Sequence, residues 1–195
     1  MNLGVALTVF LLIALAELPD KTMIAVLIMG SRSRPVLVWI GAVLAFAVHV
    51  TVAVAVGRLL QLLPHRWVEG VTTALFAAGA VYLFFVPEKE QEEKGEQEAD
   101  QARKGLKTIT AAFLVILVGE FGDLTQILTA NLAARYHAAV SVFVGALAGL
   151  AAASALAAFG GKALLRVMPV ALIRKAGGVV LAGFAVYTLV TLVRG

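Results

Sequence analysis

The chain contains no cysteine, and only 14% of its 195 residues are charged. Without cysteine it has no disulfide, no thiolate metal site and no dithiol redox chemistry. A soluble domain of this length would carry roughly a quarter charged residues. Instead 61% of the residues are hydrophobic, and runs long enough to span a bilayer, about 20 residues each, recur along the sequence. The composition predicts an integral membrane protein.

Six apolar segments predict an all-α fold with six transmembrane helices. Their approximate ranges are 3–29, 36–62, 68–86, 107–133, 138–160 and 170–193. The first segment has no basic residues before it and no clear cleavage site after it, so we expect a mature helix rather than a signal peptide. Residues 87–106 are rich in Glu, Lys and Gln and have no apolar face. We interpret them as a solvated linker, with a cation-gathering antenna as the alternative.

The linker separates two similar halves, a first repeat at 1–86 and a second at 107–195. Residues 17–22, ELPDKT, align with residues 120–125, EFGDLT, at an offset of 103. Gly41 matches Gly145 at an offset of 104. Each half holds three predicted spans, an odd number, so the second copy would enter the membrane from the opposite side. This is the inverted-repeat plan of many secondary transporters.

Basic residues predict the orientation. Eleven lysines and arginines lie on the side of the linker and four lie on the other side. The excess places the linker in the cytoplasm and both termini outside the inner or plasma membrane. Because basic residues in membrane proteins mainly set orientation, the net charge of +4 does not predict nucleic-acid binding.

The two acidic motifs lie deep inside their predicted spans. Glu17 and Glu120 are about 14 and 13 residues from the starts of these spans, or roughly 20 Å into the bilayer, near its midplane. The i, i+3 spacing puts Glu17 and Asp20 on one helical face, and likewise Glu120 and Asp123. We therefore expect two acidic clusters that face each other across the pseudo-two-fold axis.

A proline and a glycine occupy the same position in the two motifs. Pro19 lacks an N–H group and Gly122 tolerates unusual backbone angles, so each loosens its helix and frees carbonyl oxygens. Irregular backbone is tolerated at this depth only against protein or a wet cavity. Thr22, Thr125 and Gln126 add further oxygens within one turn. We expect motif helices one and four to be broken or kinked at the midplane.

A purely structural interpretation stays open for the first motif, where Glu17 and Lys21 can neutralise each other at i, i+4. In the second motif Leu124 replaces the lysine, so Glu120 and Asp123 have no local cation. Burying an ionised group at the midplane costs about 2.5–3.5 kcal/mol on the insertion scale. Protons, a distant Lys21 or a bound cation must therefore compensate the second motif.

Carboxylates with hydroxyl, amide and carbonyl oxygens form a hard site suited to Ca²⁺, Mn²⁺ or Mg²⁺. Four carboxylates and Lys21 carry a net charge of −3, which one divalent ion reduces to −1. When the ion leaves, protons are expected to replace it. Such a site is the minimum machinery for cation/proton exchange. In the second span His49 is a candidate proton relay or outer-shell partner, with a hydrogen-bonded packing histidine as the alternative.

The paired motif resembles E-φ-G-D-(K/R)-(T/S), which characterises the Golgi-type divalent cation/proton antiporter family. Members of that family include manganese and calcium transporters and bacterial manganese exporters, and the resemblance covers essentially the whole chain. It implies a transporter rather than an enzyme, with no cofactor besides the transported ion. It also implies cation binding by Glu17, Asp20, Glu120 and Asp123, helped by Thr22 and Thr125.

Two positions depart from the family pattern. Pro19 stands in place of glycine, and Leu124 stands in place of a basic residue. The second change makes the site more negative than the family pattern, so ion preference and proton stoichiometry do not transfer directly. The bacterial members make Mn²⁺ the first expectation and Ca²⁺ the second.

Two other functions compete with cation/proton exchange. Similar three-helix duplications serve in amino-acid efflux, so an exporter of small cationic organic solutes is one alternative. An intramembrane aspartyl protease is a remote one, because its G-x-G-D motif requires glycine where Glu120 stands. The expected partners are a divalent ion, protons and the lipid bilayer, without nucleic acid. Gly145 and Gly149 form a small-xxx-small ridge for helix contact, either within one subunit or between copies in a homo-oligomer.

Overall fold

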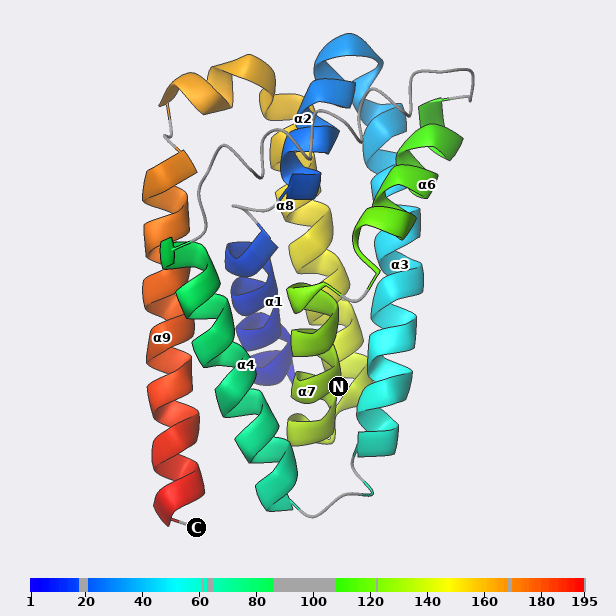
Figure 1. Cartoon of the computed structure of the whole chain (residues 1–195). Helices are drawn as coiled ribbons and strands as arrows, with labels where there is room; N and C mark the ends of the chain where they lie inside the picture. Colours follow the sequence, from blue (N-terminus) through cyan, green and yellow to red (C-terminus); the bar gives the residue numbers. More distant parts are fainter. Residues whose placement is uncertain are drawn as a thin grey trace.

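The computed structural model describes residues 1–17, 21–60, 62, 65–85, 108–121, 123–167 and 170–194. All regular structure in these residues is helical (Figure 1). The helices are α1 (Leu3–Glu17), α2 (Lys21–Arg32), α3 (Pro35–Leu60), α4 (His65–Phe85), α6 (Thr108–Gly119), α7 (Leu124–Tyr136), α8 (Ala139–Val167) and α9 (Val170–Arg194). Each of the six predicted apolar segments is therefore helical, and Pro35 opens α3 at the position where a helix needs no N–H donor. The predicted linker, 87–106, lies outside the described residues.

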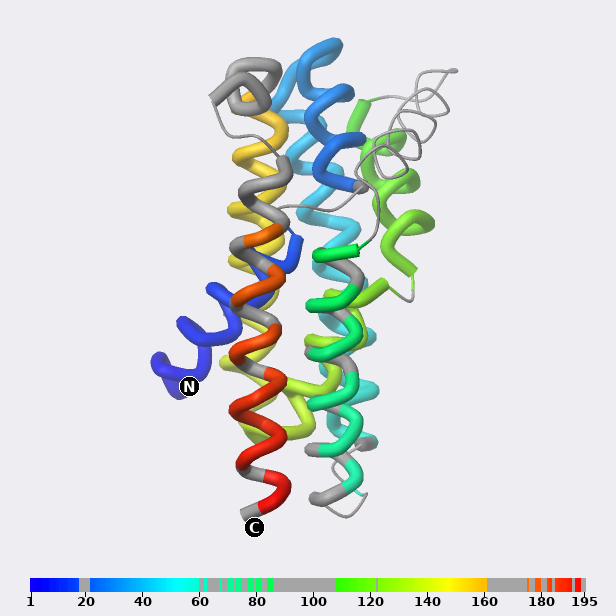
Figure 2. The backbone as a smooth tube through the Cα atoms, turned by 60° about the vertical axis from the view of Figure 1, so that its left-hand side comes forward, coloured from blue at the N-terminus to red at the C-terminus, as the bar shows by residue number. Residues whose placement is uncertain are grey.

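The two segments that carry the acidic motifs are each divided into two helices. The axes of α1 and α2 differ by 76°, and those of α6 and α7 differ by 72°. Both breaks lie inside the bundle rather than at its ends (Figures 1 and 2). The breaks predicted from the motif sequences are therefore present, although Pro19 and Gly122 themselves lie outside the described residues.

Each half of the chain packs its long helix against the broken helix pair of the other half. Helix α3 contacts α6 and α7, and α8 contacts α1 and α2 in the same way. Helices α4 and α9 lie side by side along one face of the bundle (Figure 1). This exchange places the breaks against helices from the opposite half, so both halves contribute to the surroundings of each motif.

Glycines allow close contacts between helices of different halves. A side chain at Gly145 of α8 would meet the backbone carbonyl oxygen of Ala6 in α1. A side chain at Gly41 of α3 would meet the carbonyl oxygen of Ile109 in α6, the equivalent contact of the other half. At Gly149, a Cβ atom would lie 2.8 Å from the carbonyl oxygen of Phe10. The ridge formed by Gly145 and Gly149 therefore packs within one subunit, which resolves the alternative left open by the sequence.

The outer surface of the long helices is apolar. Leu44, Val48, Val52 and Val56 are exposed at four-residue spacing along one side of α3. A helix that is apolar on its outer as well as its inner side is typical of a membrane span. Among the described residues, two helices, at Pro35–Leu59 and Ala139–Gly160, are long and apolar enough to cross a membrane, and the number is four if each bent pair is one span. The count of six spans stays a prediction.

Candidate cation site

The first motif ends α1 with a buried carboxylate. Glu17 is the last residue of α1 and is 2% exposed. Thr22, in the first turn of α2, is fully buried, and its hydroxyl donates a hydrogen bond of 3.0 Å to Oε1 of Glu17. The structure thus brings these two predicted site residues together across the break. Asp20 and the side chain of Lys21 lie outside the described residues.

The second motif also places a buried glutamate at the end of its first helix. Glu120 follows directly after α6 and is also 2% exposed. Its backbone N–H donates to the carbonyl oxygen of Ile116 at 2.9 Å, which continues the last helical turn. Asp123 is the N-cap of α7, and its carboxylate accepts a hydrogen bond of 3.4 Å from the backbone N–H of Thr125. A carboxylate at this position is stabilised by the positive end of the α7 dipole.

Both glutamates lie at the C-terminal end of a helix, where the helix dipole adds partial negative charge to that of the carboxylate. A helix carries roughly half a negative charge at its C-terminus, where its last carbonyl groups have no partner in the helix. Glu17 and Glu120 each lie at such an end, within the interior of the bundle. Burial therefore combines a carboxylate and a helix C-terminus at both breaks. This combination attracts cations and protons.

A small cavity lies beside the second break. The space in it that a water-sized molecule can occupy is about 10 Å³. Polar side chains from α3, α7 and the break meet apolar side chains there. Its lining comprises Phe46, His49, Val50, Ala53, Glu120, Thr125, Gln126, Thr129 and Leu150. A buried carboxylate, two hydroxyls, an amide and an imidazole thus converge on one space.

His49 connects α3 to the second motif. Its side chain is 4% exposed, and Nδ1 lies 3.1 Å from the side-chain amide nitrogen of Gln126. Its ring also packs near Phe121, with the ring centroids 6.3 Å apart. The predicted hydrogen-bonded histidine is therefore present, and it borders the same cavity as Glu120. His137, by contrast, is exposed at the end of α7.

The structure gathers four predicted site residues, Glu120, Thr125, Gln126 and His49, around one cavity. Glu17 and Thr22 form their own pair and are not among the cavity-lining residues. Within the described part of the chain, no three His, Asp or Glu side chains lie close enough together to hold a metal ion. Because Asp20 is outside that part, the four-carboxylate site remains a prediction.

Thr129 and the apolar lining of the cavity were not predicted from the sequence. Thr129 is buried, and its hydroxyl donates to the carbonyl oxygen of Thr125 at 2.7 Å. A signal for it existed, since it lies one helical turn after Thr125 in an otherwise apolar segment. Phe46, Val50 and Leu150 gave no signal, because a cavity-lining apolar residue has the same sequence pattern as any core residue.

Comparisons with known proteins identify related chains. A family model described as "Divalent cation/proton antiporter GDT1" matches residues 5–91 and 108–194. GDT1-like protein sll0615 of Synechocystis sp. is 31% identical over 166 residues, covering 78% of this chain and 80% of that protein. GDT1-like protein 3 of Oryza sativa subsp. indica is 27% identical over 195 residues, covering 90% of this chain and 70% of that protein.

Longer relatives extend beyond the matched region. Protein PAM71 of Arabidopsis thaliana, a chloroplastic protein, is 28% identical over 208 residues, which cover 94% of this chain. The chain spans little more than half of PAM71, at 56% of its length. No solved structure matches the chain significantly.

Proposed function

Because the chain belongs to the GDT1 family of divalent cation/proton antiporters, we propose that it exports a divalent cation in exchange for protons. The family is one of transporters rather than classical enzymes, and its membrane setting fits the apolar outer surface of α3. The proposal applies the activity of the family to this chain and assigns the residues that carry it.

One observation carries the proposal. Glu17 and Glu120 are both 2% exposed and both lie at the C-terminal end of a helix that breaks inside the bundle. In a low-dielectric interior, a carboxylate beside a helix C-terminus needs a compensating positive charge. A divalent cation or protons supply that charge in turn, and this alternation couples the two fluxes.

The proposed mechanism is alternating access around these breaks. Six spans in two inverted three-helix repeats would present the motifs from opposite sides of the membrane. Glu17, Asp20, Glu120 and Asp123 are the proposed acidic residues of the exchange, with oxygens from Thr22, Thr125 and Gln126. The residues of the second motif would hold the ion, and those of the first would mainly exchange protons. Lys21 and His49 would adjust the charge of the site. The exchange of helices between the halves supports this arrangement, because movement of one half changes the walls around the motif of the other.

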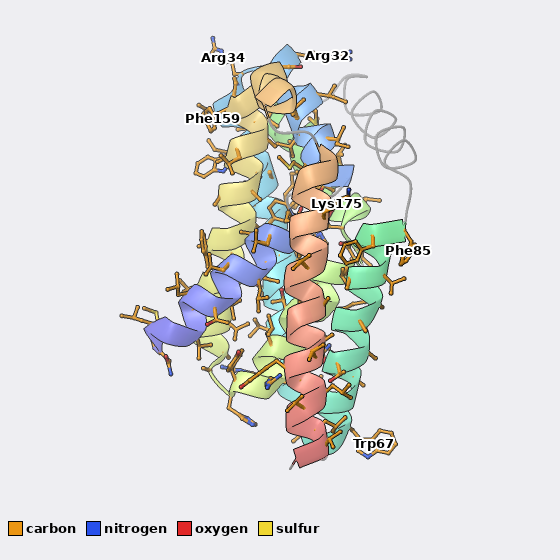
Figure 3. All side chains as sticks on the ribbon, turned by 90° about the vertical axis from the view of Figure 1, so that its left-hand side faces the viewer. Arg32, Arg34, Trp67, Phe85, Phe159 and Lys175 are labelled. Carbon is orange, nitrogen blue, oxygen red and sulfur yellow. The ribbon has the colours of Figure 1, made fainter. Side chains whose placement is uncertain are left out.

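The proposed orientation places the linker in the cytoplasm and both termini outside. Arg32 and Arg34 lie at one end of the molecule and Trp67 at the other (Figure 3). Both chain ends lie in the half of the bundle away from the two arginines (Figures 1 and 2). A basic cytoplasmic end and an aromatic residue at the opposite interface fit the positive-inside pattern and the aromatic belts of membrane proteins.

The size of the cavity favours an ion over an organic solute. The space in it that a water-sized molecule can occupy is about 10 Å³, about the room of one water molecule or ion and far below the roughly 300–1,000 Å³ of typical small-molecule sites. A cationic amino acid therefore fits this cavity less well than a partly dehydrated ion. Mn²⁺ is the proposed ion and Ca²⁺ the second choice, with no resident cofactor.

Reconstitution into liposomes tests the proposal. Purified protein is placed in vesicles that hold a pH-sensitive dye, and a pH gradient is imposed with Mn²⁺ on one side. We expect Mn²⁺ movement coupled to proton movement in the opposite direction. Protein-free vesicles and a Glu120→Gln variant that inserts normally should show neither flux. Absence of proton flux with Mn²⁺, Ca²⁺ and every other divalent ion tested would refute the proposal.

A further inference from the structure

The cavity beside the second break contains one nitrogen atom whose bonding is incomplete. His49 is more than nine-tenths buried and lines the cavity together with Glu120. Its Nδ1 faces Gln126 at 3.1 Å, whereas its Nε2 is buried and has no hydrogen-bond partner among the described residues. A buried polar atom without a partner destabilises the folded state, because it has lost its hydrogen bonds to water without replacing them. We therefore expect a group that the protein binds to interact with Nε2 of His49.

The two tautomers of His49 need different partners at Nε2. If the Gln126 amide N–H donates to Nδ1, then Nε2 carries the proton and needs an acceptor. If the amide is turned by half a rotation, its oxygen accepts from Nδ1–H, and Nε2 then presents a lone pair. Amide oxygen and nitrogen are interchangeable in shape, so both arrangements fit the same contact. In the second arrangement Nδ1–H is held by an oxygen, as it is in most metal-ligating histidines.

We propose that Nε2 of His49 binds the transported cation directly and makes the site prefer Mn²⁺ to Ca²⁺ and Mg²⁺. This inference rests on the proposed function and names the ligand that sets its selectivity. Ca²⁺ and Mg²⁺ take almost only oxygen ligands, whereas imidazole is a good ligand for transition metals. One nitrogen among oxygens therefore favours Mn²⁺ over Ca²⁺ and Mg²⁺, although it would favour Fe²⁺ or Zn²⁺ still more.

The surroundings of His49 supply the remaining ligands. Glu120 provides a carboxylate, and Thr125 and Thr129 provide hydroxyl oxygens in the same cavity. The backbone carbonyl groups of Ile116 and Leu117, in the last turn of α6, are close enough to interact with the His49 ring, but neither meets the geometry of a hydrogen bond to Nε2. Carbonyl groups at a helix C-terminus carry negative partial charge and favour a cation there. A nitrogen, a carboxylate and neutral oxygens thus belong to residues that line one cavity.

The nitrogen ligand is confined to one half of the chain. Position 153 in α8 corresponds to His49 through the offset of 104 that relates Gly41 to Gly145, and it is a buried alanine. The motif at the first break therefore has no equivalent imidazole. We infer that selectivity among divalent ions is set at the second break, beside Glu120.

Electron spin-echo spectroscopy of bound Mn²⁺ tests the contact. Purified full-length protein receives Mn²⁺, and nuclear modulation is compared between natural-abundance protein and protein labelled with ¹⁵N-histidine. We expect modulation from one directly bound imidazole nitrogen, which the label changes. It should vanish in His49→Gln and persist in His137→Asn, a matched control at an exposed histidine where asparagine tolerates the left-handed backbone. Bound Mn²⁺ without histidine modulation in the wild type would overturn the inference, even if His49→Gln failed to fold.

Selectivity in liposomes provides the second measurement. We expect His49→Gln to lose about tenfold or more of its preference for Mn²⁺ over Ca²⁺. Unchanged selectivity in a normally inserted His49→Gln variant would remove His49 from the ligand set while leaving the proposed antiport intact. If the proposed antiport itself is wrong, the result is different, because the wild-type protein then shows no cation-dependent proton flux at all.

Discussion

The second break of the chain is lined by polar side chains at positions where the first break has apolar ones. The corresponding pairs are Gln126 and Met23, Thr129 and Val26, and His49 and Ala153. Met23, Val26 and Ala153 are all buried, so the difference lies inside the bundle rather than on its surface. The acidic residues are repeated, but their environment is not.

This difference separates two tasks. A buried glutamate at the end of a broken helix occurs in both halves, so both breaks attract positive charge. Among the residues that the structure describes, the cavity and the imidazole described above border the second break, and residues 18–20 of the first break lie outside those residues. We therefore expect the second motif to bind and select the ion, and the first motif to contribute mainly to its exchange with protons.

The largest expected effect comes from neutralising the glutamates. Glu120→Gln should weaken Mn²⁺ binding by about a hundredfold, because it removes a charged ligand from the cavity. Glu17→Gln should also stop coupled transport, yet it should weaken binding in detergent much less, since Glu17 does not line that cavity. Calorimetric titration with Mn²⁺ measures both affinities. Equal losses in the two variants would remove the distinction between the breaks.

The next effect concerns the equivalent close contacts of the two halves. Gly41→Ala and Gly145→Ala place a methyl group against a backbone carbonyl, so each should lower the stability by about 1–3 kcal/mol. Gly183→Ala is the matched control, because a Cβ there meets nothing within 4 Å and alanine favours the helix. Thermal unfolding in detergent should therefore show lower stability for Gly41→Ala and Gly145→Ala and slightly higher stability for Gly183→Ala. A loss in only one half would show that the helix exchange is not symmetric.

A smaller effect distinguishes the two threonines. Thr22→Val removes the hydroxyl that donates to Glu17, so it should cost about 1 kcal/mol of stability with little change in Mn²⁺ affinity. Thr125→Val removes a hydroxyl from the cavity, so affinity should fall more than stability. Unfolding and titration of both variants give the comparison. The reverse pattern would assign ion binding to the first break.

The smallest effect separates capping from ligation at Asp123. Asp123→Ala should lower the stability by about 0.5–2 kcal/mol through loss of the α7 cap, whereas Asp123→Asn should keep it. If Asp123 also binds the ion, the asparagine variant will fold normally and transport poorly. Full transport by Asp123→Asn would restrict this residue to capping.

Local sequence patterns were sufficient to predict the helices and their breaks. Uninterrupted apolar segments define α3 and α8, and the positions of Pro19 and Gly122 predicted the interruptions that divide α1 from α2 and α6 from α7. These features depend on backbone chemistry within a few residues. A single sequence therefore contains the information that determines them.

The packing of helices from different halves could not be predicted in this way. His49 and Gln126 are 77 residues apart in the sequence. The residues around His49 therefore do not indicate that it contacts Gln126. Likewise, the ridge at Gly145 predicts close packing but does not identify α1 as its partner. Long-range contacts follow from the way the halves assemble, so the motif residues were predictable while the cavity was not.

Anomalous diffraction from crystals of the protein grown with Mn²⁺ would test the central claim most directly. The account predicts a Mn²⁺ peak in the cavity at the second break, within bonding distance of the Glu120 carboxylate. A protein that transports Mn²⁺ in liposomes but shows its peaks only away from both breaks would contradict it.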